Sequence, residues 1–383
     1  MKGVHMRKLT LLFLTILAVG FMAGFADIPV QRNSSGEIKN KLDKITLKTI
    51  RIWGEEDENA DENYFFKNPI DVAHDSQNNF YVLDNNLHCI KVFAANGEFL
   101  RQFGEKGQGP ESFLSPFNMG IDDKDQVWVV DWGNRRFQVL STTGKSLAVI
   151  RSNVFYSHLL FPGNNQMAYC ESESGHQGKG IIKVLDRAGK VLAIIGAGML
   201  PPKVDCPWAG GEFDWYQVAY GKKKEKYYIA TKYTQMIQSF QKDGKLCDVI
   251  FYDTPINQEL KMVWDSKKNN FDLPRKAKQY SECVDIAIDD NGLIFIVVTT
   301  REPAENEIMS MVLVNSSFFY KPPQNFPEKT DRYRLMVFGP DGKVVAVTQL
   351  NTYCSGIYIH KNRLFILDTA FNGVIYEYKY AIR

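Results

Sequence analysis

The sequence predicts an all-β protein, a six-bladed β-propeller with four-stranded antiparallel blades. Three observations lead to this prediction. A short apolar strand that ends in Asp recurs at Asp84, Asp131 and Asp368. A unit of four short strands occurs twice in succession, with its second copy 47 residues after its first, and weaker copies continue to the C-terminus. Short strands at even spacing between Gly-, Asn- and Asp-containing turns are typical of antiparallel meanders.

The first 26 residues are predicted to form a secretory signal peptide. Lys2, Arg7 and Lys8 precede an apolar run over residues 9–21, and small residues follow up to Ala26. A membrane anchor is the alternative, but the run is shorter than the roughly 20 residues that a spanning helix needs. The pattern favours cleavage after Ala26 and a secreted or periplasmic protein with no transmembrane segment. No Cys stands at the cleavage site, so a bacterial lipid anchor is not indicated.

The composition is that of a globular protein with little net charge. The chain has 46 Lys and Arg against 44 Asp and Glu, and cleavage would remove three of the basic residues. A nucleic-acid-binding domain needs a basic face, so this balance argues against nucleic acid as a partner. The one dense basic run, GKKKEK from Gly221 to Lys226, is interpreted as a solvated turn.

The six cysteines are widely spaced and match no zinc or haem motif. An even number of cysteines in an exported protein permits disulfides. Cys283 and Cys354 stand at corresponding places in two successive units, so a disulfide between them is one hypothesis. A pairing of Cys206, in the long linker, with another cysteine is a second hypothesis, and buried free thiols are the alternative.

Six units account for residues 45–383, which we interpret as one propeller domain. The sixth unit stops one strand short, and the missing strand is found at the other end of the chain, in ITLKTIRIW from Ile45. We expect this N-terminal strand to complete the last blade, which closes the ring and leaves no open edge. Residues 27–44 are expected to be a loose polar leader. The units occupy residues 68–104, 115–150, 156–196, 215–253, 283–350 and 354–380, with an insertion at 301–331 in the fifth.

The second unit carries a recognisable pattern. Between Pro116 and Gly144 the chain has a proline, an apolar strand, VWVVD and then NRRFQVL, and the linker before it reads FGEKGQGPESFLSP. This pattern resembles the NHL-repeat family of six-bladed propellers. The resemblance implies the fold. The family includes protein-binding modules, lyases and relatives of metal-dependent lactonases, so the resemblance does not select one function.

The recurring Asp residues are expected to be structural. Asp84, Asp131 and Asp368 each end the second strand of a unit. An Asp side chain in that place can accept hydrogen bonds from backbone N–H groups of the following turn.

The long segments of the chain are predicted to gather on one face of the disc. Turns between first and second strands, and between third and fourth strands, are short throughout. All long segments fall in the two remaining classes of connection, which share the opposite face, and such loops commonly carry function. Trp208, Trp215 and Tyr216 are candidate residues there for contact with a sugar, a peptide or a protein, with packing of the loops as the alternative. The segments are 171–180, 196–214, 253–281 and 301–331.

A ring of polar residues is predicted at the mouth of the central channel on the same face. One residue per unit occupies an equivalent place near the start of the first strand: Asp71, Asn118, His158, Gln217, Asp285 and Gly356. Buried polar groups must be hydrated, mutually bonded or bound to a ligand. One hypothesis is a ligand site, in which the oxygens of Asp71, Asp285 and Asn118 hold a divalent cation such as calcium. A hydrated polar channel is the alternative.

No catalytic motif was found, and no catalytic residue is assigned. The favoured hypothesis is an exported, non-catalytic binding propeller that recognises a protein, peptide or glycan through its long-loop face and channel mouth. The alternative is a metal-dependent lyase or lactonase-like hydrolase with its site at the channel mouth. A structural role in an envelope assembly is a third possibility.

Overall fold

The computed structural model describes most of the chain from residue 28 onward. The predicted signal peptide, Trp208, Trp215 and Cys206 lie outside the described residues. Within the described part, no helix combines the length and apolar character needed to cross a membrane. The described ranges are 28–54, 61–152, 158–170, 181–186, 189–196, 216–231, 235–254, 263–265, 270–272, 283–307, 310–314, 317–321, 323–369 and 373–383.

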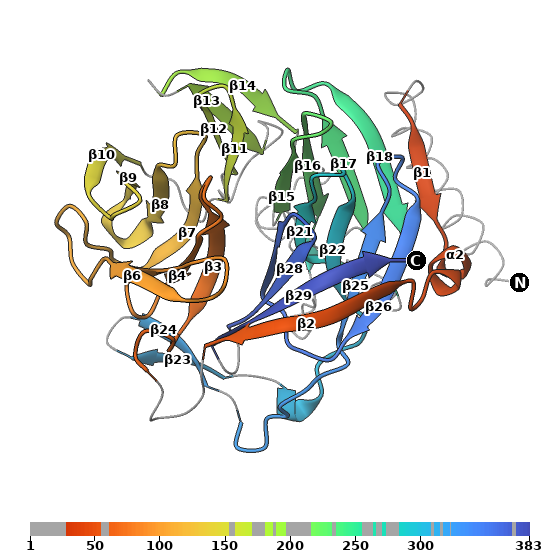
Figure 1. Cartoon of the computed structure of the whole chain (residues 1–383). Coiled ribbons are helices and arrows are strands. Elements are labelled where there is room, and N and C mark those ends of the chain that lie inside the picture. Colours follow the sequence, from red (N-terminus) through yellow and green to blue (C-terminus); the bar gives the residue numbers. More distant parts are fainter. Residues whose placement is uncertain are drawn as a thin grey trace, which may run out of the picture.

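Six four-stranded antiparallel sheets form the blades of a disc around a central axis, as predicted (Figure 1). Blade 1 contains β3 (Pro69–His74), β4 (Phe80–Asp84), β5 (Cys89–Phe93) and β6 (Phe99–Phe103). Blade 2 contains β7 (Pro116–Ile121), β8 (Val127–Asp131), β9 (Arg136–Leu140) and β10 (Ser146–Arg151). Blade 3 contains β11 (Leu159–Gly163), β12 (Gln166–Cys170), β13 (Ile182–Asp186) and β14 (Val191–Ile195).

The second half of the ring has the same plan. Blade 4 contains β15 (Tyr216–Gly221), β16 (Lys226–Thr231), β17 (Met236–Phe240) and β18 (Leu246–Tyr252). Blade 5 contains β21 (Cys283–Ile288), β22 (Ile294–Thr299), β25 (Tyr333–Phe338) and β26 (Val344–Leu350). Blade 6 contains β27 (Gly356–His360), β28 (Arg363–Asp368), β29 (Val374–Ile382) and, as its outer strand, β2 (Ile45–Trp53).

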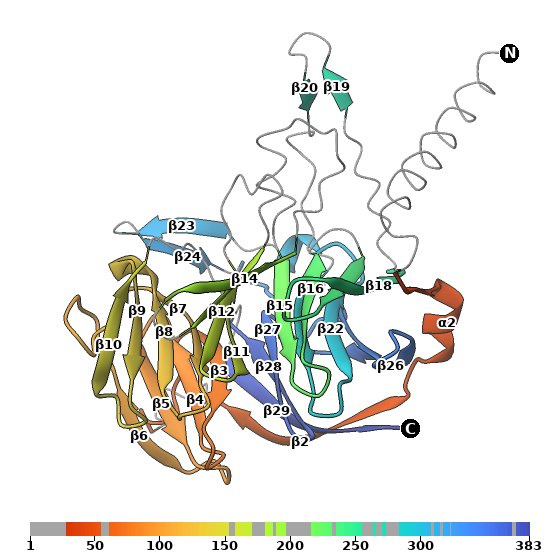
Figure 2. The ribbon, with the colours of Figure 1, turned by 90° about the horizontal axis from the view of Figure 1, so that it is seen from above.

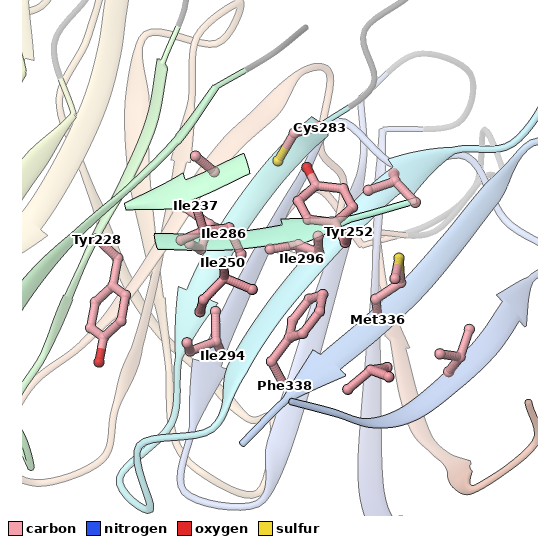
Figure 3. Close-up of a cluster of buried hydrophobic side chains, with 14 of the residues drawn as sticks. Tyr228, Ile237, Ile250, Tyr252, Cys283, Ile286, Ile294, Ile296, Met336 and Phe338 are labelled. Carbon is pink, nitrogen blue, oxygen red and sulfur yellow. The ribbon is translucent and has the colours of Figure 1, made fainter. Parts of the chain in front are cut away.

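The core lies between the blades. Both faces of a second strand are covered by neighbouring blades, so β4 and β8 are buried along their whole length and read as continuous apolar runs. Between blades 4 and 5, Tyr228 and Ile250 share one cluster with Ile286 and Phe338 (Figure 3). Fully burying an apolar side chain of this size contributes about 1.5–3 kcal/mol.

The ring is closed by the N-terminal strand, as the repeat pattern predicts. β2 pairs antiparallel with β29 from Ile45 opposite Ile382 to Trp53 opposite Ile375. Blade 6 is therefore built from one N-terminal strand and three C-terminal strands.

The segment expected to be a loose leader is instead folded against the disc. β1 (Val30–Asn33) pairs in parallel with β18 on the outer edge of blade 4. Helix α2 (Ser35–Asn40) follows, and it begins with a capping box between Ser34 and Glu37. Ile38 of this helix is 4% exposed and belongs to the core cluster of blades 4 and 5.

The role in the following turn that was expected for the strand-ending Asp residues is confirmed for Asp84. Asp84 Oδ1 accepts hydrogen bonds from the backbone N–H groups of Asn86 (3.0 Å) and Leu87 (2.8 Å). Asp84 Oδ2 accepts from Lys67 N (2.7 Å) in the linker that precedes the blade. Asp131 likewise accepts from Leu114 N at 2.7 Å.

These bonds bring the turn after the second strand next to the linker before the first strand. Both classes of connection therefore share one face of the disc, which we call the loop face. The opposite face, which holds the tight turns, is called the turn face. Figure 2 shows the two small sheets of the insertions on one side of the disc. They are β19 (Val263–Asp265) with β20 (Asn270–Asp272), and β23 (Ser310–Val314) with β24 (Ser317–Lys321).

The proposed disulfide between Cys283 and Cys354 is not formed. Both cysteines are buried, and no disulfide joins them. Their thiols lie near backbone oxygens two residues further on, with Sγ–O distances of 3.7 Å to Asp285 and 3.6 Å to Gly356. The interpretation as buried thiols therefore holds for this pair.

Candidate functional site

A cavity of about 320 Å³ occupies the central channel. It is lined by residues from the first strand of every blade and by the turns that follow three of these strands. Four of the predicted ring residues line it: Asp71, Asn118, His158 and Asp285.

Strand register shows that the ring residues are structurally equivalent. Asp71 pairs with Leu83, and Asn118 pairs with Val130; each partner stands just before the end of a second strand. In blade 3, Cys170 N donates to His158 O at 3.2 Å. The corresponding pairs in blades 4, 5 and 6 are Gln217 with Ala230, Asp285 with Val297, and Gly356 with Leu367.

Side chains of the ring connect neighbouring blades. Asp71 Oδ2 of blade 1 accepts a hydrogen bond of 2.8 Å from Met119 N of blade 2. Asn118 Oδ1 of blade 2 accepts one of 2.7 Å from Leu159 N of blade 3.

Blade 5 repeats this contact with blade 6. Asp285 Oδ2 accepts a hydrogen bond of 2.8 Å from Ile357 N. In all three cases the side chain at the ring position receives the N–H group just after the ring position of the next blade. The carboxylate and amide oxygens that were candidates for a cation are thus acceptors that hold the blades together.

The two ring carboxyl groups have perturbed acidity. Burial raises the pKa of Asp71 to about 7, although N–H groups of Met119 and Val72 donate to it. Burial also raises the pKa of Asp285 to about 7, against the hydrogen bonds from Ile357 and Ile286. Both groups therefore change protonation near neutral pH. Among the described residues, no group of three or more His, Cys, Asp or Glu side chains is arranged to hold a metal ion.

The other ring positions differ from one another. Burial lowers the pKa of His158 to about 4, so its imidazole is neutral at pH 7. Gln217 does not line the cavity, and its Oε1 is buried without a hydrogen-bond partner among the described residues. Gly356 contributes no side chain to the ring between Asp285 and Asp71. A Cβ atom at this position would lie 3.3 Å from Asp285 Oδ2.

Of the three aromatic residues predicted to form a site on the loop face, Tyr216 lies among the described residues. Trp208 and Trp215 lie outside the described residues. Tyr216, a candidate contact residue with packing as the alternative, is the first residue of β15 and is only 7% exposed. It packs in the core cluster between blades 3 and 4, with Cys170 and Val218. For Tyr216 the structure therefore agrees with the packing alternative.

The turn-face end of the channel holds a second polar group that the sequence analysis missed. The imidazole rings of His74 and His360 lie 3.6 Å apart, centroid to centroid. His74 Nδ1 is in hydrogen-bond contact with the Tyr358 hydroxyl. Both histidines are the last residues of first strands, in the adjacent blades 1 and 6. Counted from the equivalent ring positions Asp71 and Gly356, His74 corresponds to Ile359 rather than to His360, so the repeat carries no signal for this pair.

Comparison with known proteins agrees with this architecture. Residues 61–195 match the model of the family DUF5128, described as a six-bladed β-propeller. The human NHL repeat-containing protein 3 is 33% identical over 78 residues, which span 19% of this chain and 22% of that protein.

Solved structures show the same fold at low identity. A DUF4221 family member from Bacteroides vulgatus has a TM-score of 0.56 and 9% identity, covering 88% of this chain and 98% of that one. A Bacteroides fragilis protein described as a candidate exported protein has a TM-score of 0.55 and 9% identity, covering 93% of this chain and 99% of that one. Taken with the strand order and the repeat pattern, these findings show that the chain is a six-bladed β-propeller with similarity to NHL-repeat proteins.

Proposed function

We propose that this protein is an exported binding propeller that recognises a protein, peptide or glycan through its loop face and the adjoining channel mouth. One observation carries the proposal. The long segments after Cys170, Gly196, Asp253 and Thr299 all leave the disc on the loop face, because strand parity fixes where each begins and ends. Variable loops on a rigid scaffold are the usual location of recognition sites.

The hydrogen bonds made by the ring residues favour ligand binding by the loops rather than a metal-dependent reaction at the ring. The carboxylate oxygens of Asp71 and Asp285 accept hydrogen bonds from backbone N–H groups of their own and neighbouring blades. A cation bound there would have to compete with these contacts. The ring then supplies a rigid rim, and the loops supply the contacts that select a partner.

Binding is tested with arrays of glycans and peptides probed with the purified protein. A double variant, Trp208→Ala with Trp215→Ala, removes the two large loop aromatics, and Lys223→Ala on the turn face is the matched control. We expect saturable binding to one ligand class that falls at least tenfold in the double variant and stays unchanged in the control. Equal binding by all three proteins, or none by any, would contradict the proposal.

Export is tested separately. The full chain is expressed in a bacterial host with a periplasm, and the N-terminus of the product is determined by mass spectrometry. Cleavage after Ala26 would give a protein that begins at Asp27. A product that keeps residues 1–26 in the cytoplasmic fraction would rule out export by this signal.

The alternative of a metal-dependent lyase or lactonase-like hydrolase makes a different prediction. It requires a stoichiometric metal ion at the ring. Elemental analysis of protein purified without chelator, beside a variant with Asp71→Ala and Asp285→Ala, distinguishes the two functions. A metal present in the wild type and absent from the variant would favour the enzyme and contradict the binding proposal.

A further inference from the structure

The outer strand of blade 2 is an open sheet edge with apolar side chains. β10 is the last strand of its sheet, and no described strand pairs with its far side (Figure 1). All of its residues from Leu147 to Arg151 are exposed. The exposed fractions are 52% for Leu147, 45% for Val149 and 39% for Ile150. An apolar edge with unpaired N–H and C=O groups is a template for pairing with a further strand.

The chain covers the corresponding edges of blades 4 and 5 with its own N-terminal segment. β1 pairs in parallel with β18, the outer strand of blade 4. Further along, Asp43 N donates to Val347 O at 2.8 Å, and Val347 N donates to Lys41 O at 2.9 Å, on the outer strand of blade 5. Two outer edges are thus covered by extended backbone, whereas no described backbone pairs with the edge of β10.

The blade that follows leaves this edge accessible. A Cβ atom on Gly244, in the last turn of blade 4, would lie 3.0 Å from Ile194 O, so this turn lies against the outer strand of blade 3. The glycine of the equivalent turn in blade 3 is Gly189, and a Cβ atom there would meet no atom within 4 Å. At Gly189, therefore, the turn of blade 3 makes no comparable contact with β10.

Alternate residues of β10 direct their backbone groups away from the sheet. Ser152 N donates to Arg135 O at 2.9 Å, which places a hydrogen-bonded pair just beyond the end of β10. The antiparallel register with β9 is unbroken from Ala148 to Arg151. Hydrogen-bonded pairs alternate along an antiparallel ladder. The N–H and C=O groups of Val149 and Arg151 therefore face away from β9 and have no partner in the sheet.

The edge carries opposite charges at its two ends. At its start, Glu111 Oε1 accepts a hydrogen bond of 3.0 Å from Ser146 N. The backbone N–H of Glu111 donates to Gln138 Oε1 at 3.1 Å, which holds the residue against blade 2. Its ion pair with Lys145, 3.4 Å long, involves a lysine side chain that is 76% exposed. At the end of the strand, Arg151 is exposed and forms no ion pair with a described residue.

These features make the edge complementary to a second copy of itself. Two β10 strands can align antiparallel with Val149 on a two-fold axis, where its outward N–H and C=O groups bond to those of its counterpart. Each Arg151 then lies opposite Leu147 of the other copy, one residue from Ser146. Because the Glu111 carboxylate is bound at Ser146, Arg151 of one copy meets Glu111 of the other. A lipid bilayer does not fit this edge, because unpaired backbone groups are not tolerated in hydrocarbon.

We propose that the protein forms a two-fold symmetric dimer through antiparallel pairing of two β10 strands, which joins the four-stranded sheets of both copies of blade 2. The exposed side chains of Leu147, Val149 and Ile150 become buried at this junction, and two ion pairs between Arg151 and Glu111 flank it. β10 runs from the turn face to the loop face, so antiparallel pairing directs the two loop faces to opposite sides. A junction of one strand per copy is small, so the dimer dissociates on dilution.

The test is sedimentation velocity of the purified protein over a hundredfold range of concentration, where we expect a reversible monomer–dimer equilibrium. Val149→Pro removes the outward N–H on the axis but no bond to β9, and proline is tolerated at such edge positions. It should weaken the dimer at least tenfold, and so should Val149→Lys. The matched control is Leu192→Lys, because Leu192 on the outer strand of blade 3 is 46% exposed. It should change the dissociation constant less than twofold.

A charge exchange tests the pairing of the two copies. Arg151→Glu and Glu111→Arg should each weaken the dimer at least tenfold, and the double variant should recover most of the loss because the ion pair is restored with its charges exchanged. Lys190→Glu, at an exposed position of blade 3, is the control and should have no effect. Thermal melts verify that each variant is folded. A monomer at every concentration, equal weakening by Val149→Lys and Leu192→Lys, or a double variant no tighter than the single ones would each overturn the proposal.

Discussion

The indole Nε1 of Trp53 donates a hydrogen bond of 2.8 Å to Oε2 of Glu377, across 324 positions of the sequence. Trp53 ends the N-terminal strand β2, and Glu377 lies in the C-terminal strand β29. Glu377 is fully buried, and its charge is balanced by Arg363, whose Nη1 lies 2.8 Å from Oε1. The two ends of the chain are therefore joined by a buried charged group as well as by sheet pairing.

Replacing Glu377 with Ala should destabilise the closed ring strongly. The change leaves the buried Trp53 N–H without its acceptor, which costs about 1–3 kcal/mol. It also removes the carboxylate that pairs with the Arg363 guanidinium. Urea denaturation gives the free energy of unfolding. Lys379→Ala, on an exposed position of the same strand, is the control and should change it by less than about 0.5 kcal/mol. Similar values for the two variants would show that the contact does not secure the closure.

The side chain of Asn118 should stabilise the junction of blades 2 and 3. Asn118→Ala leaves the Leu159 N–H without its acceptor, which costs about 1–3 kcal/mol. Asn118→Asp keeps that acceptor but places a carboxylate where the amide donates to Asp71 at 2.6 Å. Because the pKa of Asp71 is about 7, the Asp variant should lose more stability at pH 8 than at pH 5. Denaturation of both variants at both pH values checks this; an Asp variant with no pH dependence would refute it.

Asn33 should be the residue that fastens the N-terminal segment to the disc. Its side chain is 3% exposed; Nδ2 donates to Gly342 O at 2.9 Å, and Oδ1 accepts from Val344 N at 2.7 Å. Asn33→Ala is expected to lower the free energy of unfolding by about 1–3 kcal/mol. It should also expose the segment to limited proteolysis. Asn40→Ala, at an exposed position of α2, is the matched control and should do neither.

Acid should weaken the protein through its paired histidines. The pKa of His74 in the fold is about 4, below the 6.5 of an unfolded chain. The unfolded state therefore binds more protons between these values, so the stability that the neutral ring contributes above pH 6.5 is lost as the pH falls toward 4. His74→Gln removes this loss. The difference in unfolding free energy between variant and wild type should shift in favour of the variant by on the order of 2–3 kcal/mol over that range.

The measurement requires denaturation curves from pH 7 to pH 4 in buffer without phosphate. Lys379→Ala should show a difference that does not vary with pH. A His74→Gln curve parallel to that of the wild type would contradict the prediction.

The carboxyl group of Asp285 should have the opposite effect to His74 and lower the stability of the protein as the pH rises. Its pKa is about 7 in the fold, above the ordinary value of 3.8, so the folded state binds more protons between these values. Stability from this group is present at low pH and lost as the pH rises through 7. Asp285→Asn cannot ionise, so relative to wild type it should be more stable at pH 8.5 than at pH 5.5. Denaturation at the two pH values decides this, and a constant difference would exclude a titrating Asp285.

The sequence by itself determined the number of blades, the order of strands and the route of ring closure. Strands such as β4 and β8 are encoded by a local pattern of apolar residues, and turn residues such as Asp84 act on backbone within a few positions or in the adjacent linker. The repeat also located the equivalent ring positions, because residues that match between units occupy the same place in each blade.

Only the tertiary structure decided what these positions do. Asp71 bonds to Met119 of the next blade, the ring of His74 lies against that of His360 from the other end of the chain, and Tyr216 is buried by a neighbouring blade. The segment at β1, polar in sequence, pairs with the exposed edge of blade 4 because Asn33 matches backbone groups of blades 4 and 5. Each of these contacts joins residues that no local pattern relates, and each depends on how six blades twist and pack once the ring is closed.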